Sequence, residues 1–223
     1  MMKKVAAILF SVFIASSVAF GAGKDLEVQG RVIKSQKPPF LFALPSELQW
    51  IHSSSMEHPK ENSLTRTFFL VKEQKRQVEE MLIIQIADKT HPEAGPMTVP
   101  PLQPYAEKRM YLKGKVKRGE VEVDYLTQLM AWNPEAPSLQ PLVKKGRVIP
   151  SHWTLQSQIL FQSQLEHAVF IRYSKDIHSF EWKVSDEGKN WDKAPLSGNE
   201  KKVVEAFQRA VSGMIDSLRF QNP

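Results

Sequence analysis

The sequence predicts an α+β fold, in which an antiparallel β-sheet carries a C-terminal amphipathic helix packed on one face. Three observations support this prediction. Short apolar or alternating segments recur along the chain, as they do in antiparallel strands. Near the C-terminus, apolar residues recur instead at three- and four-residue spacing, as on one face of a helix. The 223 residues contain no cysteine, so packing rather than disulfides must stabilise the fold.

The strand predictions rest on apolar runs and on alternation. The two most apolar runs, 67–71 and 81–87, read as strands buried on both faces, and the charged residues 72–76 between them read as a hairpin connection. The other segments alternate or end at turn residues. The predicted strands are 26–33, 40–44, 67–71, 81–87, 121–129, 153–161, 169–173 and 180–184.

The helix is predicted from about Asn199 to Leu218. Its apolar residues form one stripe, and residues 197–200 fit a capping box. Gly213 lies inside it and costs about 1 kcal/mol relative to alanine. The stripe consists of Val203, Val204, Phe207, Val211, Met214, Ile215 and Leu218.

Two proline-rich segments, 91–104 and 133–150, interrupt the strands. The first holds five prolines and the second four, so neither is expected to form regular secondary structure. Long loops often carry function. If these loops frame a polar concavity, they indicate a ligand. If they lie flat on the surface, they indicate a protein partner.

Residues 1–21 read as a cleavable secretory signal peptide. Lys3 and Lys4 precede an apolar stretch, and small residues follow at two possible cleavage points, after Ala19 or after Gly21. A membrane anchor is the alternative, but the apolar core is shorter than the roughly 20 residues that span a bilayer. Without a cysteine near the cut, a lipoprotein is excluded. We therefore expect one domain, 22–223, in the periplasm or secreted, with no transmembrane segment after cleavage.

No motif in the chain specifies a reaction. Patterns for a serine-hydrolase elbow, a phosphate loop and a dinucleotide fold are missing, thiol catalysis is excluded, and no cofactor is expected. The alternative is an exported hydrolase with a histidine and carboxylate site, using His52, His58 or His91. His52 and His58 with Glu57 and Glu61 could bind zinc, although a solvated loop is the simpler interpretation.

One basic cluster is the candidate binding surface. The domain after residue 21 has 28 basic and 24 acidic residues, a net charge of about +4, which permits contact with anionic lipid, glycan or an acidic envelope protein. Nucleic acid is not expected, because basic and aromatic residues do not interleave. The alternative is a solvated hairpin whose charges prevent edge-to-edge aggregation. The cluster comprises Lys108, Arg109, Lys113, Lys115, Lys117 and Arg118.

Both ends of the domain resemble the PsbP-like superfamily. Phe42-Ala43-Leu44-Pro45 precedes Trp50, and the helix runs into Ser217-Leu218-Arg219-Phe220. Members open with a Leu-Pro-x-x-Trp-like strand and close with a Ser-Phe-x-Phe-like strand. Here the spacing between Pro45 and Trp50 is longer than in that pattern, and Leu218 replaces an aromatic residue. The resemblance implies a sandwich around an antiparallel sheet, and a binding or assembly factor of the cell envelope rather than an enzyme.

Overall fold

The computed structural model describes residues 25–91, 93, 95–104, 110–150, 153–184, 191, 196 and 198–220. Its strands are β1 (Leu26–Gln29), β2 (Val32–Gln36), β3 (Pro39–Ala43), β4 (Gln49–His58), β5 (Ser63–Gln74), β6 (Gln77–Lys89), β7 (Met110–Arg118), β8 (Val121–Ala131), β9 (Trp153–Ser163), β10 (His167–Asp176) and β11 (Arg219–Phe220). Its helical segments are η1 (Pro59–Glu61), η4 (Pro137–Leu139), α1 (Gln140–Lys144), η5 (Ile177–Ser179) and α2 (Gly198–Ser217).

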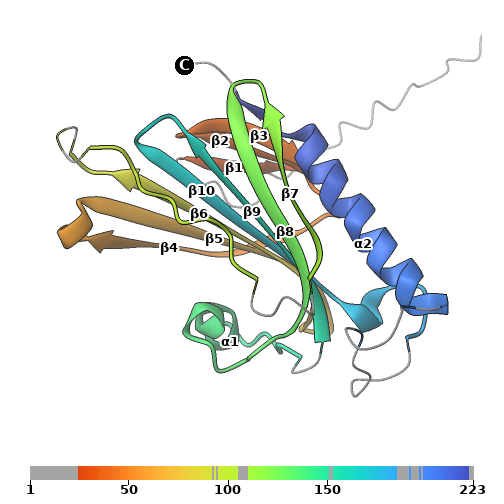
Figure 1. Ribbon diagram of the computed structural model, residues 1–223. Helices are drawn as coiled ribbons and strands as arrows, with labels where there is room; N and C mark the ends of the chain where they lie inside the picture. Colours follow the sequence, from red (N-terminus) through yellow and green to blue (C-terminus); the bar gives the residue numbers. More distant parts are fainter. Residues whose placement is uncertain are drawn as a thin grey trace, which may run out of the picture.

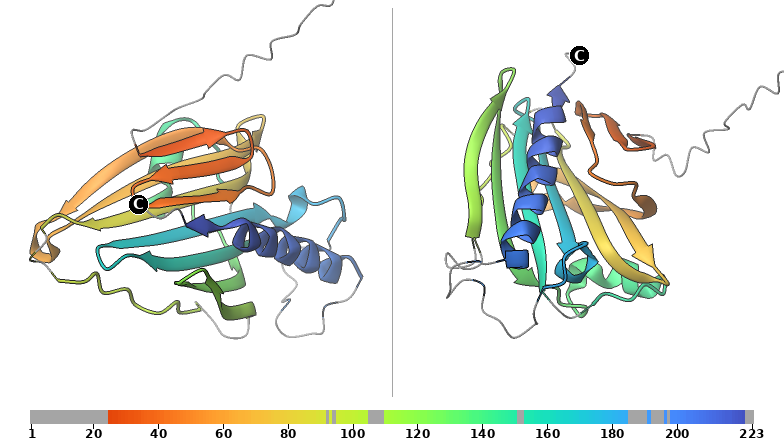
Figure 2. Two further views of the ribbon diagram at one scale, coloured as in Figure 1. Left: turned by 90° about the horizontal axis from the view of Figure 1, so that it is seen from above. Right: turned by 90° about the vertical axis from the view of Figure 1, so that its right-hand side faces the viewer.

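The predicted α+β class is confirmed. Seven strands in the described residues form a large antiparallel sheet in the order β4-β5-β6-β10-β9-β8-β7, and four form a smaller sheet in the order β1-β2-β3-β11 (Figure 1). The predicted C-terminal helix is α2, whose apolar stripe is buried. Figure 2 shows α2 and the smaller sheet on the same side of the large sheet.

Alternation along the strands gives the large sheet two faces. The inner face, with Phe68, Leu82 and Ile171, packs with the smaller sheet and α2 into the main core. The outer face carries the intervening residues, such as Phe69 and Ile83, in a second cluster. This explains the uninterrupted apolar runs of β5 and β6, because each face of these strands is covered.

Both proline-rich segments lie on the outer face. Trp132, Leu139 and Leu142 pack over Phe69 and Ile83, whereas Val99 and Leu102 pack over Leu126, Leu160 and Phe170. Between these apolar patches the outer face carries polar side chains, several of which are buried. The segments therefore cover only parts of the sheet. On the uncovered part, a pocket of about 490 Å³ lies beside Phe170 and is lined mostly by polar side chains of β4, β5 and β6. The buried polar side chains are Gln128, Gln156, Gln158 and Ser174.

Several element predictions were wrong in detail. The segment 133–150 does contain regular structure, the short helices η4 and α1, because their prolines occupy first-turn positions where no N–H is needed. The segment 26–33 is a hairpin rather than one strand, since Gly30 takes a left-handed conformation (φ +57°) between β1 and β2. Residues 180–184 follow η5 without forming a strand.

The connection between β5 and β6 is also tighter than expected. Both strands extend to a two-residue turn, where Lys75 and Arg76 have positive φ values of 51° and 70°. Such turns match the twist of antiparallel strands. The sequence patterns missed β4 and β7, the two edges of the large sheet, because edge strands carry polar and charged side chains.

Residues 1–21 and the expected capping residue Ser197 lie outside the described residues. Within the described part, no helix is long and apolar enough to cross a membrane.

Candidate functional site

A buried carboxylate, Glu80, lies at the start of β6 on the inner face. Only 1% of its surface is exposed. The register places Lys72 of β5 and Lys175 of β10 directly opposite it, so that a carboxylate stands between two ammonium groups in one cross-strand row. Such opposite-charge pairs stabilise neighbouring strands.

Every oxygen of this carboxylate has a partner. The hydroxyl groups of Ser46 and Tyr173 donate hydrogen bonds of 2.6 and 2.7 Å to Oε2. Lys175 donates a bond of 3.0 Å to Oε1, and the Nζ of Lys72 lies 3.6 Å from the same oxygen. Four side chains from three segments therefore converge on Glu80. A buried charge needs such partners.

These contacts set the protonation of two groups. Burial alone raises the pKa of Glu80, but the hydrogen bond from Ser46, the charge of Lys175 and the bonds from Tyr173 and Lys175 together lower that pKa below its ordinary value. Burial, with the neighbouring Glu80 charge, raises the pKa of Tyr173 well above its ordinary value. At neutral pH, Glu80 is ionised and Tyr173 keeps its proton.

A pocket of about 310 Å³ opens beside Glu80, between the end of the large sheet and α2. Tyr173 forms part of its floor and stacks on Phe207 of α2, with ring centroids 5.3 Å apart. Lys175 Nζ lies 4.5 Å from the centre of the Phe180 ring. The pocket thus combines a polar floor with apolar walls, as ligand pockets usually do. Its lining comprises Pro45, Ser46, Glu80, Tyr173, Lys175, Ser179, Phe180, Glu181, Trp182, Ala206, Phe207 and Ala210.

The chemistry of this pocket favours recognition over proton transfer. A general acid or base needs a pKa near the working pH, whereas the pKa of Glu80 is shifted down and that of Tyr173 up. Both groups are therefore fixed in one protonation state at neutral pH.

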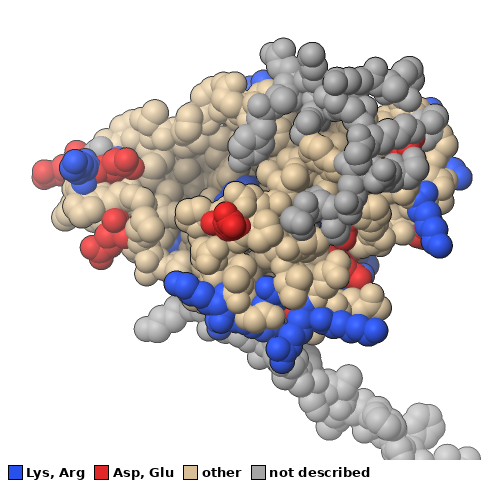
Figure 3. Space-filling model, turned by 90° about the horizontal axis from the view of Figure 1, so that it is seen from below, with Lys and Arg blue, Asp and Glu red and all other residues tan. Residues whose placement is uncertain are grey.

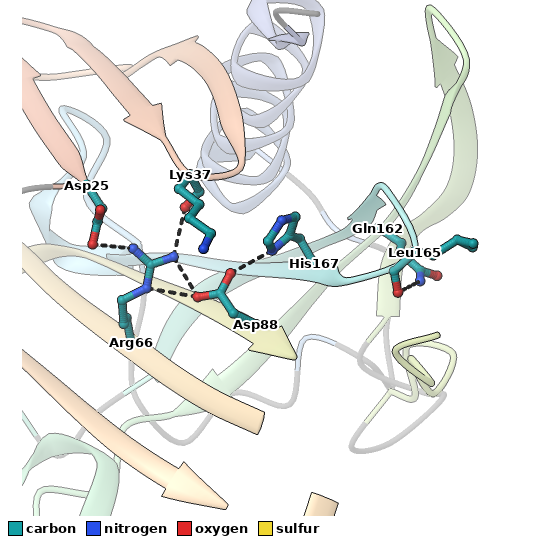
Figure 4. Close-up of polar contacts among 7 residues, drawn as sticks. All are labelled: Asp25, Lys37, Arg66, Asp88, Gln162, Leu165 and His167. Carbon is teal, nitrogen blue, oxygen red and sulfur yellow. Dashed lines mark hydrogen bonds and ion pairs between the residues drawn. The ribbon is translucent and has the colours of Figure 1, made fainter. Parts of the chain in front are cut away.

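A second buried polar cluster joins the two sheets at the opposite end of β6. Asp88 Oδ1 lies 2.7 Å from His167 Nδ1, and Asp88 Oδ2 accepts bonds of 3.0 and 2.6 Å from Arg66. Arg66 also forms a 2.5 Å ion pair with Asp25 and donates to the Lys37 carbonyl oxygen. Figure 4 shows Arg66 between the two aspartates, so this cluster ties the hairpin β2–β3 and the chain before β1 to the large sheet.

The structure describes four members of the predicted basic cluster, all on one strand. Lys108 and Arg109 lie outside the described residues, and Lys113, Lys115 and Lys117 lie on the edge strand β7. Acids of β8 compensate part of this charge: Lys115 lies 2.6 Å from Glu122 and 3.2 Å from Asp124, and hydrogen bonds to them raise the pKa of Lys115. The sixth member, Arg118, pairs with Asp216 in the last turn of α2.

The histidines named for a hydrolase do not form a cluster with carboxylates. His52 and His58 lie on strand β4 rather than in a loop, and the His52 ring lies 5.9 Å from that of Phe69. His91 is exposed just after β6. Among the residues that the structure describes, no three His, Asp or Glu side chains are grouped so that they could hold a metal ion.

Sequence reasoning missed the Glu80 pocket. The only signal was an acid beside an apolar strand, Glu80 before 81–87, which looks like an ordinary solvated strand end. Its three hydrogen-bond donors, Ser46, Tyr173 and Lys175, lie 34 to 95 residues away, and only the tertiary fold brings them to it.

A scan of protein-family models, a search of curated proteins and a search of solved structures found no match to this chain.

Proposed function

We propose that the protein is an exported, non-enzymatic binding or assembly protein of the cell envelope, whose Glu80 pocket takes part of its ligand. The observation that carries this proposal is the fully paired, ionised carboxylate at the pocket floor. Held in this way, it orients Tyr173 and Lys175 instead of exchanging protons. Export rests on the signal-like residues 1–21.

The pocket lining indicates what chemistry the ligand should have. Phe180 and Trp182 offer apolar surface, while Lys175 is partly exposed and keeps donors for a polar group. A ligand with an apolar or aromatic body and a polar group that accepts hydrogen bonds fits this arrangement.

A retention experiment with paired variants tests the proposal. The chain from residue 22 is immobilised, incubated with envelope extract, and the retained proteins, lipids and glycans are identified by mass spectrometry. Ala210→Trp fills the pocket, whereas Ser212→Trp adds the same bulk to an exposed position of α2. We expect a species that the wild type and Ser212→Trp retain and Ala210→Trp loses. Retention of nothing by the wild type contradicts the binding role, and equal retention by both variants contradicts the pocket.

The resemblance to the PsbP-like superfamily forms part of the same proposal. Its support is topological: β11 follows α2 directly and pairs with β3, the strand that ends before Pro45. The two segments that carry the resemblance are therefore neighbours in the smaller sheet. Fold analogy of this kind supports a binding role only by association.

A hydrolase is the second candidate, and the pairing of His167 with Asp88 favours it. A carboxylate on Nδ1 orients a catalytic histidine in serine hydrolases, and the register places Ser163 opposite His167 on the next strand. However, the described hydrogen bonds do not join Ser163 to His167, and Arg66 occupies the other oxygen of Asp88. Hydrolysis of chromogenic esters that His167→Ala abolishes while the fold persists would establish this candidate.

A further inference from the structure

A second basic surface lies where the β5–β6 turn meets α1. Lys75 and Arg76 form the turn, Lys144 ends α1 and Lys145 follows it, and all four are exposed. Figure 3 shows Lys and Arg side chains gathered at this lower end of the molecule. We call these four residues, with Val143 and Val148, the basic end surface. It is separate from β7, because β6, β10, β9 and β8 stand between β5 and β7.

Backbone hydrogen bonds make this surface one rigid unit. The Val148 N–H donates to the Arg76 carbonyl oxygen, and the Val78 N–H donates to the Val148 carbonyl oxygen, each at 2.9 Å. Gly146, with φ +74°, ends α1 and donates a 2.9 Å bond to the Val143 carbonyl oxygen. The turn and the end of α1 therefore hold their side chains in a fixed arrangement.

Two valines are exposed among these cations. Val143 and Val148 are 39% and 57% exposed, whereas the adjacent Leu142 and Ile149 are buried in the outer-face cluster. The buried neighbours anchor the segment, so the valines are held in water by the fold itself. Moving such exposed apolar side chains from water into an apolar phase is energetically favourable.

The charge of this surface is largely uncompensated. Arg147, beside it, pairs with Glu73 at 2.9 Å. Lys75, Arg76, Lys144 and Lys145 form no ion pair with any acidic residue that the structure describes. On β7, by comparison, Glu122 and Asp124 pair with Lys115, whereas Lys113 and Lys117 form no described ion pair.

We propose that the basic end surface docks on an anionic lipid bilayer. Val143 and Val148 enter the boundary between headgroups and acyl chains, while the four cations meet lipid phosphates. A bilayer fits better than a soluble acidic partner, because it places negative charge directly above an apolar interior. The inference requires only that the exported protein meets a membrane, and it does not depend on ligand binding in the Glu80 pocket.

Vesicle partitioning with matched variants tests this proposal. The chain from residue 22, which contains every described element, is sedimented with phosphatidylcholine vesicles that contain or lack phosphatidylglycerol. We expect binding only to the anionic vesicles, and loss of most of it at about 1 M salt, where the Debye length is about 3 Å. Each basic residue near the surface contributes about fivefold, so Lys144→Gln with Lys145→Gln should lower partitioning about 25-fold. Lys113→Gln with Lys117→Gln removes the same charge from β7 and should leave partitioning to the anionic vesicles unchanged.

The valines distinguish a bilayer from charge alone. Val143→Ser with Val148→Ser should weaken binding to anionic vesicles several-fold and leave binding to soluble polyglutamate unaltered. Equal binding to neutral vesicles, an equal loss in the β7 variant, or no effect of the valine substitutions would each overturn the proposal. Circular dichroism of every variant verifies that the fold is retained, and retention of ligand by the same variants shows whether the pocket function survives.

Discussion

The ring of Tyr173 stacks on the ring of Phe207, with centroids 5.3 Å apart and planes inclined by 3°. This contact joins β10 to α2 immediately beside the Glu80 carboxylate, to which the Tyr173 hydroxyl donates its 2.7 Å bond. One side chain therefore links the apolar core to the polar floor of the pocket. Stability and ligand binding at this end of the molecule should respond together to changes at Tyr173.

Removing only the hydroxyl group of Tyr173 should destabilise the protein. Tyr173→Phe keeps the stacked ring but deprives the buried Glu80 of one donor, and a hydrogen bond to a charged group contributes about 2 kcal/mol. Urea unfolding at neutral pH measures the loss. Tyr125→Phe is the control, since the Tyr125 hydroxyl lies against Gly114 rather than a carboxylate. An equal effect of both substitutions would contradict the role given to the Glu80 bond.

Acid should remove the stability that Glu80 supplies. Its pKa is lowered by folding, so its contribution is fully present above about pH 4.5, the ordinary value, and is lost as pH falls through the lower folded pKa. At neutral pH we expect wild type to be more stable than Glu80→Gln, with the gap closing below about pH 4.5. Urea midpoints over this range provide the measurement, and a constant gap would contradict the prediction.

Alkali should remove the stability that Tyr173 supplies, because folding shifts the pKa of Tyr173 upward. Folding raises the pKa of Tyr173, so its contribution is complete below pH 10, the ordinary value, and is lost as pH rises further. The wild type should therefore lose more stability than Tyr173→Phe above pH 10. Absorbance of the ionised phenol, followed together with unfolding, tests whether Tyr173 releases its proton only when the chain unfolds.

Replacing Gly114 and Gly213 by alanine should change the stability of the protein in opposite directions. A Cβ on Gly114 would lie 2.5 Å from the Tyr125 hydroxyl oxygen and 2.8 Å from its ring, so Gly114→Ala should cost about 1–3 kcal/mol. A Cβ on Gly213 of α2 meets nothing within 4 Å, so Gly213→Ala should stabilise by about 1 kcal/mol. Thermal unfolding of both variants decides this. Tyr125→Leu should partly rescue Gly114→Ala, and failure to rescue would show that the strain lies elsewhere.

Arg66 should hold the smaller sheet in place. Arg66→Ala leaves Asp25 and Asp88 without their shared cation and should cost about 3 kcal/mol. Limited proteolysis should then cut the chain between residues 25 and 43 faster than in the wild type. The exposed ion pair between Lys115 and Glu122 provides the matched control. Lys115→Ala should leave the cleavage rate nearly unchanged. Unaltered cleavage in Arg66→Ala would show that the apolar core alone fixes this sheet.

The predictable part of the fold is the part with strong local pattern. The apolar runs in β5 and β6 and the stripe of α2 could be recognised because each element buries its own periodic residues. The edge strands β4 and β7 could not, since serines, histidines and lysines on an edge resemble a loop. The same limitation hid His52 and His58 within a strand.

The sequence by itself determined the α+β class, the closing helix and a core without disulfides. The tertiary structure alone decided where the chemistry lies. Glu80 and Asp88 stand at the two ends of one strand, and nothing local distinguishes them from solvated acids. They become buried centres because β5, β10 and the loop between β3 and β4 bring distant donors to them, with Ser46 34 residues and Lys175 95 residues from Glu80. Buried charge requires partners, and in a sheet of non-sequential strands those partners are assigned by topology.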